Sequence, residues 1–86
     1  MPKLAEKIKV NGNRVQLFIN PKFYDFESVK KVKEEFEQVC HVVAADEKSR
    51  IFVEMQPKKN LKPEEMELLG YEFYNHLLNA VKERGQ

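Results

Sequence analysis

The stretch IKVNGNRVQLFI, residues 8–19, carries the clearest structural signal in the chain. Asn11-Gly12 supplies the two residues with positive φ that a type I′ turn needs, and residues that alternate between apolar and polar flank it on both sides. This pattern predicts a β-hairpin with strands over residues 5–10 and 14–20.

Helical and strand periodicities alternate along the next part of the chain. Apolar residues recur at helical spacing from Phe26, and Asp25 before them suits an N-cap, so a helix is predicted over residues 26–38. Two further runs, the second alternating cleanly, predict another hairpin with strands over 40–45 and 50–56.

The final helix is predicted over residues 63–84, because Pro63 suits a first helical turn and Gly85 suits an end. The order is therefore hairpin, helix, hairpin, helix. It predicts an α+β two-layer sandwich (β-β-α-β-β-α), in which two helices lie on one face of a four-stranded antiparallel sheet. No linker divides the chain, so one domain is expected over residues 1–86.

The composition restricts the classes of protein. The chain has 86 residues and a formal net charge of +1, so no overall field draws it to nucleic acid or anionic lipid. A single cysteine rules out an intramolecular disulfide. The opening residues lack the apolar region of a signal peptide and no apolar run is long enough to span a membrane, so we expect a cytoplasmic protein.

Two phenylalanines are left over once the sheet has filled the core. The residues expected to face the helices are Val15, Leu17, Ile19, Ile51, Val53 and Met55. Strand alternation then places Phe18 and Phe52 on the opposite, uncovered face. They either form a contact platform for a second copy or a partner, or lie under a loop or terminus of their own chain.

The last helix also has more apolar surface than one sheet can cover. Its core stripe is predicted to contain Met66, Leu69, Gly70, Phe73, Leu77, Ala80 and Val81. Tyr71, Tyr74 and Leu78 form a second stripe, which either the first helix or another subunit would contact. Asn75 and Asn79 are unfavourable inside a helix, so they either bond a partner or are simply solvated. The predicted interface residues are Phe18, Phe52, Tyr71, Tyr74, Asn75, Leu78 and Asn79.

Catalytic, metal and cofactor sites are not expected. Cys40 and His41 are adjacent in a strand and point to opposite faces, and His76 is distant in sequence, so these residues do not suit one metal ion. Ser28 and Ser49 lack the glycine-rich elbow of a nucleophilic serine, and no phosphate-binding glycine loop is present. Cys40 is expected to be a small core residue.

RNA binding is the alternative function that the residues leave open. Exposed aromatic residues on a sheet can stack on bases. The basic residues that could contact phosphates are Lys7, Lys9, Arg14, Arg50, Lys58, Lys59 and Lys62. Acidic residues nearly cancel the basic ones, however, and the glycine and aromatic signatures of RNA-binding sheets are absent.

The segment EFYNHLLNAVKER, residues 72–84, resembles the closing motif of the HxsD family of the His-Xaa-Ser system. The matching residues are Leu77, Leu78, Asn79 and Arg84, whereas Ala80, Val81, Glu83 and Gly85 depart from the motif. The helix entry at Tyr24 and the strand end near Gln56-Pro57-Lys58 also resemble this family.

The resemblance implies a small accessory protein in a peptide-modifying system that contains radical-SAM-type proteins. Taken with the left-over surfaces, it leads us to expect a non-enzymatic protein-interaction module, homodimeric, with a protein or peptide partner and no cofactor.

Overall fold

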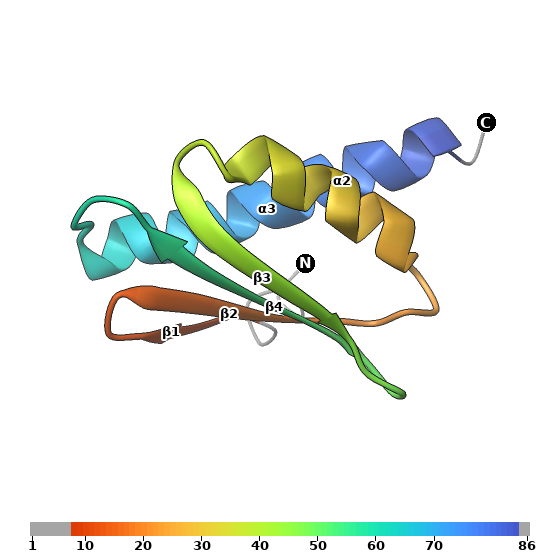
Figure 1. Cartoon of the computed structure of the whole chain (residues 1–86), viewed down its shortest axis with the longest axis horizontal. Helices are drawn as coiled ribbons and strands as arrows, with labels where there is room; N and C mark the ends of the chain where they lie inside the picture. The colour runs from red at the N-terminus through yellow and green to blue at the C-terminus, as the bar shows by residue number, and fades with distance from the viewer. Residues whose placement is uncertain (1–7, 85–86) are drawn as a thin grey trace.

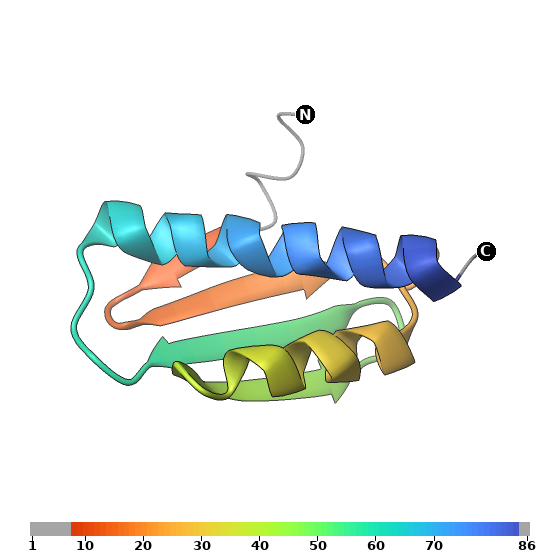
Figure 2. The ribbon, with the colours of Figure 1, turned by 90° about the horizontal axis from the view of Figure 1, so that it is seen from above.

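The computed structural model describes residues 8–84 and has the predicted α+β architecture (Figure 1). Four antiparallel strands form one open sheet, and both helices lie on the same face of it. The elements are β1 (Ile8–Asn11), β2 (Arg14–Ile19), α2 (Phe26–Phe36), β3 (Cys40–Asp46), β4 (Ile51–Pro57) and α3 (Pro63–Arg84). The strand order is β1-β2-β4-β3, so β2 and β4 are central and β1 and β3 form the edges (Figure 2).

The first hairpin forms as predicted, but its turn lies one residue further along. Asn11 pairs with Arg14, which leaves Gly12 and Asn13 as the two loop residues. Gly12 has a φ of 63°, and no other described residue has a positive φ. This is the arrangement of a type II′ turn, with glycine at the first central position, so the prediction of a type I′ turn is wrong. Residues 5–7 of the predicted first strand lie outside the described residues.

Asp25 is the N-cap of α2, as predicted. One carboxylate oxygen accepts a hydrogen bond from the backbone N–H of Ser28 at 3.2 Å, and the other accepts from the Ser28 hydroxyl at 2.7 Å. These bonds satisfy a donor that the first helical turn leaves unpaired. The helix ends at Phe36, short of the predicted end, and the N–H of Glu37 bonds to the carbonyl of Glu34.

The start of α3 is held by Glu65, whose carboxylate accepts a hydrogen bond from the N–H of Lys62 at 2.8 Å. This is the reciprocal half of a capping box. Further along, Gly70 lets the helix approach the sheet closely, because a Cβ there would lie 2.9 Å from Cγ2 of Ile8. The helix covers the predicted residues, and the predicted end signal, Gly85, lies outside the described residues.

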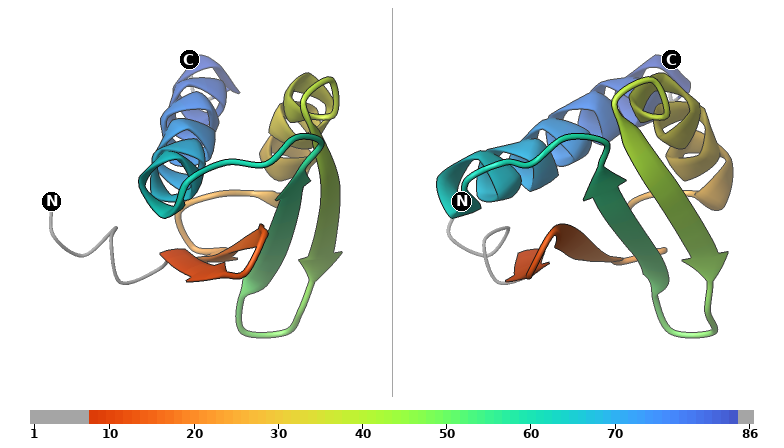
Figure 3. Two further views of the ribbon diagram at one scale, coloured as in Figure 1. Left: turned by 90° about the vertical axis from the view of Figure 1, so that its left-hand side faces the viewer. Right: turned by 60° about the vertical axis from the view of Figure 1, so that its left-hand side comes forward.

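The two helices divide the covered face between them. Helix α3 lies over β1 and β2, and α2 lies over β3 (Figure 3). The inward residues of the central strands are at most 1% exposed, as predicted: Val15, Leu17, Ile19, Ile51, Val53 and Met55. Phe36 of α2 and Phe73 of α3 pack against each other between the two helices, with ring centroids 5.3 Å apart.

Candidate interaction surface

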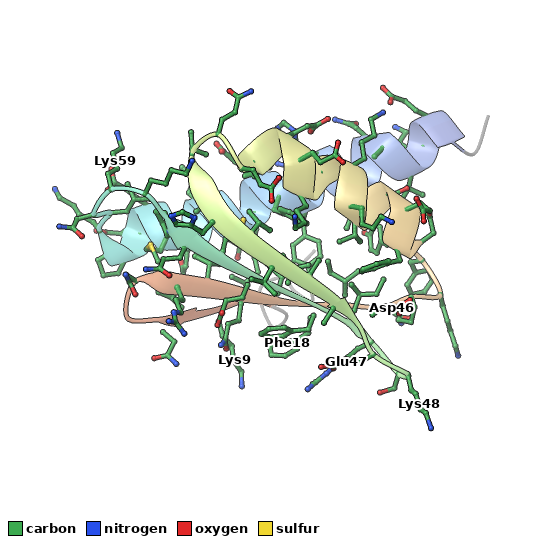
Figure 4. The ribbon with its side chains drawn as sticks, in the orientation of Figure 1. Lys9, Phe18, Asp46, Glu47, Lys48 and Lys59 are labelled. Atoms are coloured by element: carbon green, nitrogen blue, oxygen red, sulfur yellow. The ribbon has the colours of Figure 1, made fainter. Side chains whose placement is uncertain are left out.

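Phe18 and Phe52 lie on the uncovered face of the sheet, on the two central strands, near the end of β2 and the start of β4. They are direct partners across β2 and β4, and their ring centroids are 5.5 Å apart. Both side chains are partly buried. Figure 4 shows Phe18 on the side of the sheet away from the helices. The placement predicted for this pair is therefore observed.

Two cations of the same chain lie over the Phe18 ring. Nζ of Lys9 is 5.7 Å from the ring centroid, and Cζ of Arg50 is 4.6 Å from it. Such contacts are attractive because a cation favours the negative face of the ring. Arg50 is itself held by Glu47, with Nε donating to Oε1 at 3.0 Å. The aromatic pair is therefore bordered by positive charge.

A shallow hollow of about 400 Å³ opens beside this pair, where β2 ends and β4 begins. Its lining consists of Phe18, Ile19, Asn20, Lys22, Ser49 and Arg50. The Asn20 side chain is already used locally, because its Oδ1 accepts from the N–H of Lys22 at 2.9 Å. The hollow combines aromatic surface with two cations, which suits contact with a polar or acidic surface.

The next row of the open face is polar and internally paired. Nε2 of Gln16 donates to Oε2 of Glu54 at 3.1 Å, and Nη1 of Arg14 lies 3.9 Å from the same oxygen. Val43 pairs with Glu54 in the sheet and is 59% exposed. The sequence reading missed Val43, although strand alternation from the buried Cys40 would have placed it on the open face.

Tyr74 corrects the predicted second stripe of the last helix. It is only 3% exposed, and its hydroxyl donates to the backbone carbonyl of Phe18 at 2.9 Å. Its ring also lies 6.4 Å from that of Tyr24. Of the two alternatives left open for this stripe, Tyr74 therefore follows the first: it is contacted from within its own chain, and in the single chain it is not accessible as the interface residue that was predicted.

Tyr71 and Leu78 remain on the outer flank of α3. Phe36 of α2 contacts two residues of α3, Phe73 and His76. The side of α3 that carries Phe73 and His76 lies roughly opposite Tyr71 and Leu78 around the helix. Tyr71 is partly buried and Leu78 is 48% exposed. The first helix of the chain therefore does not cover this pair.

Asn75 and Asn79 are exposed on the outside of α3. Within residues 8–84, neither side-chain amide makes a hydrogen bond. Leu68, which the sequence reading did not single out, is also exposed on this helix. The two amides are therefore accessible to water or to a partner.

Among residues 8–84, two side chains have clearly shifted pKa values, and both belong to the core. Burial raises the pKa of the Cys40 thiol, and nearby Lys58 partly opposes that shift. Burial also raises the pKa of the Tyr74 phenol, and Tyr24 adds to the shift. A thiol with a raised pKa stays protonated near neutral pH, where it is a poor nucleophile.

The remaining candidate ligands do not converge. Cys40 is buried while His41 is exposed, so the two point to opposite faces, as predicted. Nδ1 of His76 instead lies 3.1 Å from Oε1 of Glu35 on α2. Among residues 8–84 no group of three or more potential ligands could hold a metal ion. No helix in this part of the chain has the length and apolar character needed to cross a bilayer.

These features define a small α+β two-layer sandwich whose open face carries an aromatic pair bordered by cations. Comparison with protein-family models, with curated proteins and with solved structures finds no match. The functional proposal below therefore depends on the surfaces of the chain itself.

Proposed function

We propose that this chain is a non-enzymatic protein-interaction module, an accessory subunit that works as a homodimer and holds a partner protein or peptide on its open sheet face. One observation carries the proposal: Phe18 and Phe52 form a ring pair on the face that neither helix covers. Aromatic residues and arginine dominate the binding energy of protein interfaces. Arg50 lies beside the pair, so an arginine and two aromatic rings are found at one place.

The character of the titrating groups supports binding over catalysis. Catalytic acids and bases combine a shifted pKa with access to a substrate. In this chain the shifted groups, Cys40 and Tyr74, face the core, whereas the hollow beside Phe18 is lined by lysine, arginine, serine and asparagine. The resemblance of residues 72–84 to the HxsD family supports an accessory role in a peptide-modifying system.

The test is a quantitative comparison of the proteins that co-purify with three forms of the full chain. We expect wild type to retain a partner that Phe52→Ser loses, whereas Leu68→Ser on the outer side of α3 retains it. Both substitutions remove a partly or largely exposed apolar side chain, so a general loss of solubility would affect both. If Phe52→Ser and Leu68→Ser retain the same proteins as wild type, the open face is not the binding surface.

RNA binding is the second candidate, because Phe18 and Phe52 lie near Lys9, Arg14 and Arg50. Bases could stack on the ring pair while the cations contact phosphates. Against this, Lys9 and Arg50 already occupy a face of Phe18, and Arg14 approaches Glu54. Anisotropy with mixed short RNAs decides the point: RNA binding requires an affinity that falls steeply with salt.

A further inference from the structure

The two edges of the sheet are protected to different degrees. Edge strands are usually blunted by short length, lysine, proline or a bulge. β1 (Ile8–Asn11) has four residues and includes Lys9. β3 (Cys40–Asp46) has seven residues, contains neither lysine nor proline, and pairs with β4 without interruption. β3 therefore offers a long, regular edge.

The alternation of hydrogen bonds between β3 and β4 shows which backbone groups of β3 point outward at that edge. The carbonyl of Val39 accepts from the N–H of Lys58 at 3.0 Å, and the N–H of Glu47 donates to the carbonyl of Arg50 at 2.9 Å. Odd-numbered residues of β3 therefore turn their backbone groups toward β4, and even-numbered residues turn theirs outward. Val42 and Ala44 are the two outward-turned residues in the middle of β3. Within residues 8–84, no hydrogen bond reaches their outward N–H and C=O groups.

We infer that β3 is a self-association edge, which pairs antiparallel with β3 of a second copy about a two-fold axis at Val43. This inference rests on the proposed function and specifies its homodimer. The register pairs all seven residues and sets Val42 opposite Ala44 of the second copy. It also brings the two Val43 side chains together on the open face, where each is 59% exposed in the single chain.

The adjoining flank of α2 fits this arrangement. A groove of about 220 Å³ runs between α2 and β3, lined by Phe26, Lys30, Lys33, Glu34 and Ala44. Because Ala44 is small, the groove leaves room beside the edge for Val42 of the second copy. A two-fold axis at this place would set the α2 helices antiparallel, with Lys30, which pairs with Glu27 at 3.5 Å in the single chain, facing Glu34 of the other copy. The charges on this flank are therefore self-complementary.

Pairing at this edge also leaves the proposed binding face free. The aromatic pair lies on the central strands, and the two open faces become one continuous surface in the dimer. A partner could then contact both copies at once, which raises its overall affinity without any new kind of contact.

The experiment measures the dissociation constant of the dimer by sedimentation of the full chain, together with hydrogen exchange. Wild type is expected to be a dimer in which the amides of Val42 and Ala44 exchange slowly. Val43→Lys sets two like charges opposite each other at the axis and is expected to weaken the dimer about tenfold or more. Exchange at Val42 and Ala44 should then become fast.

Leu68→Lys is the matched control, since it adds the same charge at an exposed apolar position on α3. It is expected to leave the dimer intact. A monomeric wild type, a dimer that Val43→Lys does not weaken, or one lost in Leu68→Lys would overturn the inference.

Phe52→Ser separates this inference from the proposed function. If the dimer is lost in Val43→Lys while partner capture does not depend on Phe52, the β3 edge is correct and the proposed binding face is wrong. If a dimer depends on Phe52 and not on Val43, the edge is wrong and the open face remains the interaction surface.

Discussion

The two faces of the sheet are built from alternate residues of the same strands, but they differ in chemistry. On the covered face, Leu17 and Val53 are paired, aliphatic and fully buried. On the open face, the next pair, Phe18 and Phe52, is aromatic and keeps part of its surface exposed. Cations border this second pair, whereas aliphatic side chains surround the first. Strand alternation therefore concentrates stability on one face and leaves contact chemistry on the other.

The greatest loss of stability is expected from substituting Leu17, and a much smaller loss from substituting its neighbour Phe18 in β2. Leu17→Ala removes a fully buried side chain and should lower the free energy of unfolding by about 2–5 kcal/mol. Phe18→Ala should cost about 1–2 kcal/mol, although the side chain is larger, because part of the ring already contacts water. Urea unfolding measures both. Equal losses would show that the open face acts as a second core.

Tyr74 links α3 to the backbone of β2 and should give a pH effect. Burial raises the pKa of its phenol above the usual value of about 10, so the folded chain holds the proton more tightly than the unfolded chain. This stability is present below pH of about 10 and is lost as the pH rises through the folded-state pKa. The free energy of unfolding should fall by up to about 1.4 kcal/mol per pH unit in that range.

Tyr74→Phe removes both the phenol and its hydrogen bond to Phe18. We expect a loss of about 1–3 kcal/mol near neutral pH, because a partly buried carbonyl loses its partner. The added fall above pH of about 10 should then be absent. Urea unfolding between neutral and alkaline pH tests this, with Tyr71→Phe on the outer flank as the control. If the alkaline fall persists unchanged in Tyr74→Phe, another group causes it.

Gly70→Ala should give a smaller effect on the covered face. Alanine favours a helix by about 1 kcal/mol over glycine, but its Cβ would lie 2.9 Å from Cγ2 of Ile8 and 3.2 Å from Cγ1 of Val15. We expect a net loss of about 1 kcal/mol in wild type. In an Ile8→Ala background the same change should become neutral or stabilising. Thermal unfolding of the four proteins measures the coupling, and additive effects would contradict the close contact.

The smallest effect is expected from Arg14→Gln on the open face. Arg14 lies 3.9 Å from Glu54, and its side chain is 54% exposed, so the ion pair is well screened. The free energy of unfolding should change by less than about 0.5 kcal/mol. A loss above about 1 kcal/mol in urea unfolding would mean that the polar row of the open face helps to hold the sheet together.

Local pattern was enough to predict most elements of the fold. Alternation around Gly12 gave the first hairpin, and Asp25 and Pro63 gave the starts of the helices, because each of these signals acts over a few residues. The turn type could not be obtained this way, since Asn11-Gly12 and Gly12-Asn13 both suit a two-residue loop. Only the pairing of Asn11 with Arg14 decides between them.

The candidate surface was predictable only where strand alternation applies. It placed Phe18 and Phe52 correctly, because a residue in a strand has just two possible faces. Tyr74 lies at the margin of the buried arc of α3, where helical spacing does not separate inside from outside. Its burial depends on the carbonyl of Phe18, which is 56 positions away in the chain. The same absence of long-range information hides the strand order and therefore the free edge of β3.

The reactivity of the Cys40 thiol can report how often the core of the chain opens. Cys40 is the only cysteine, it is 2% exposed, and it begins β3 beneath α2. A thiol reagent can therefore label the native protein only after this corner of the sandwich separates. With excess reagent, the labelling rate reports how often that separation occurs, without any engineered probe. Labelling that slows as protein concentration rises would show that assembly and local opening are linked.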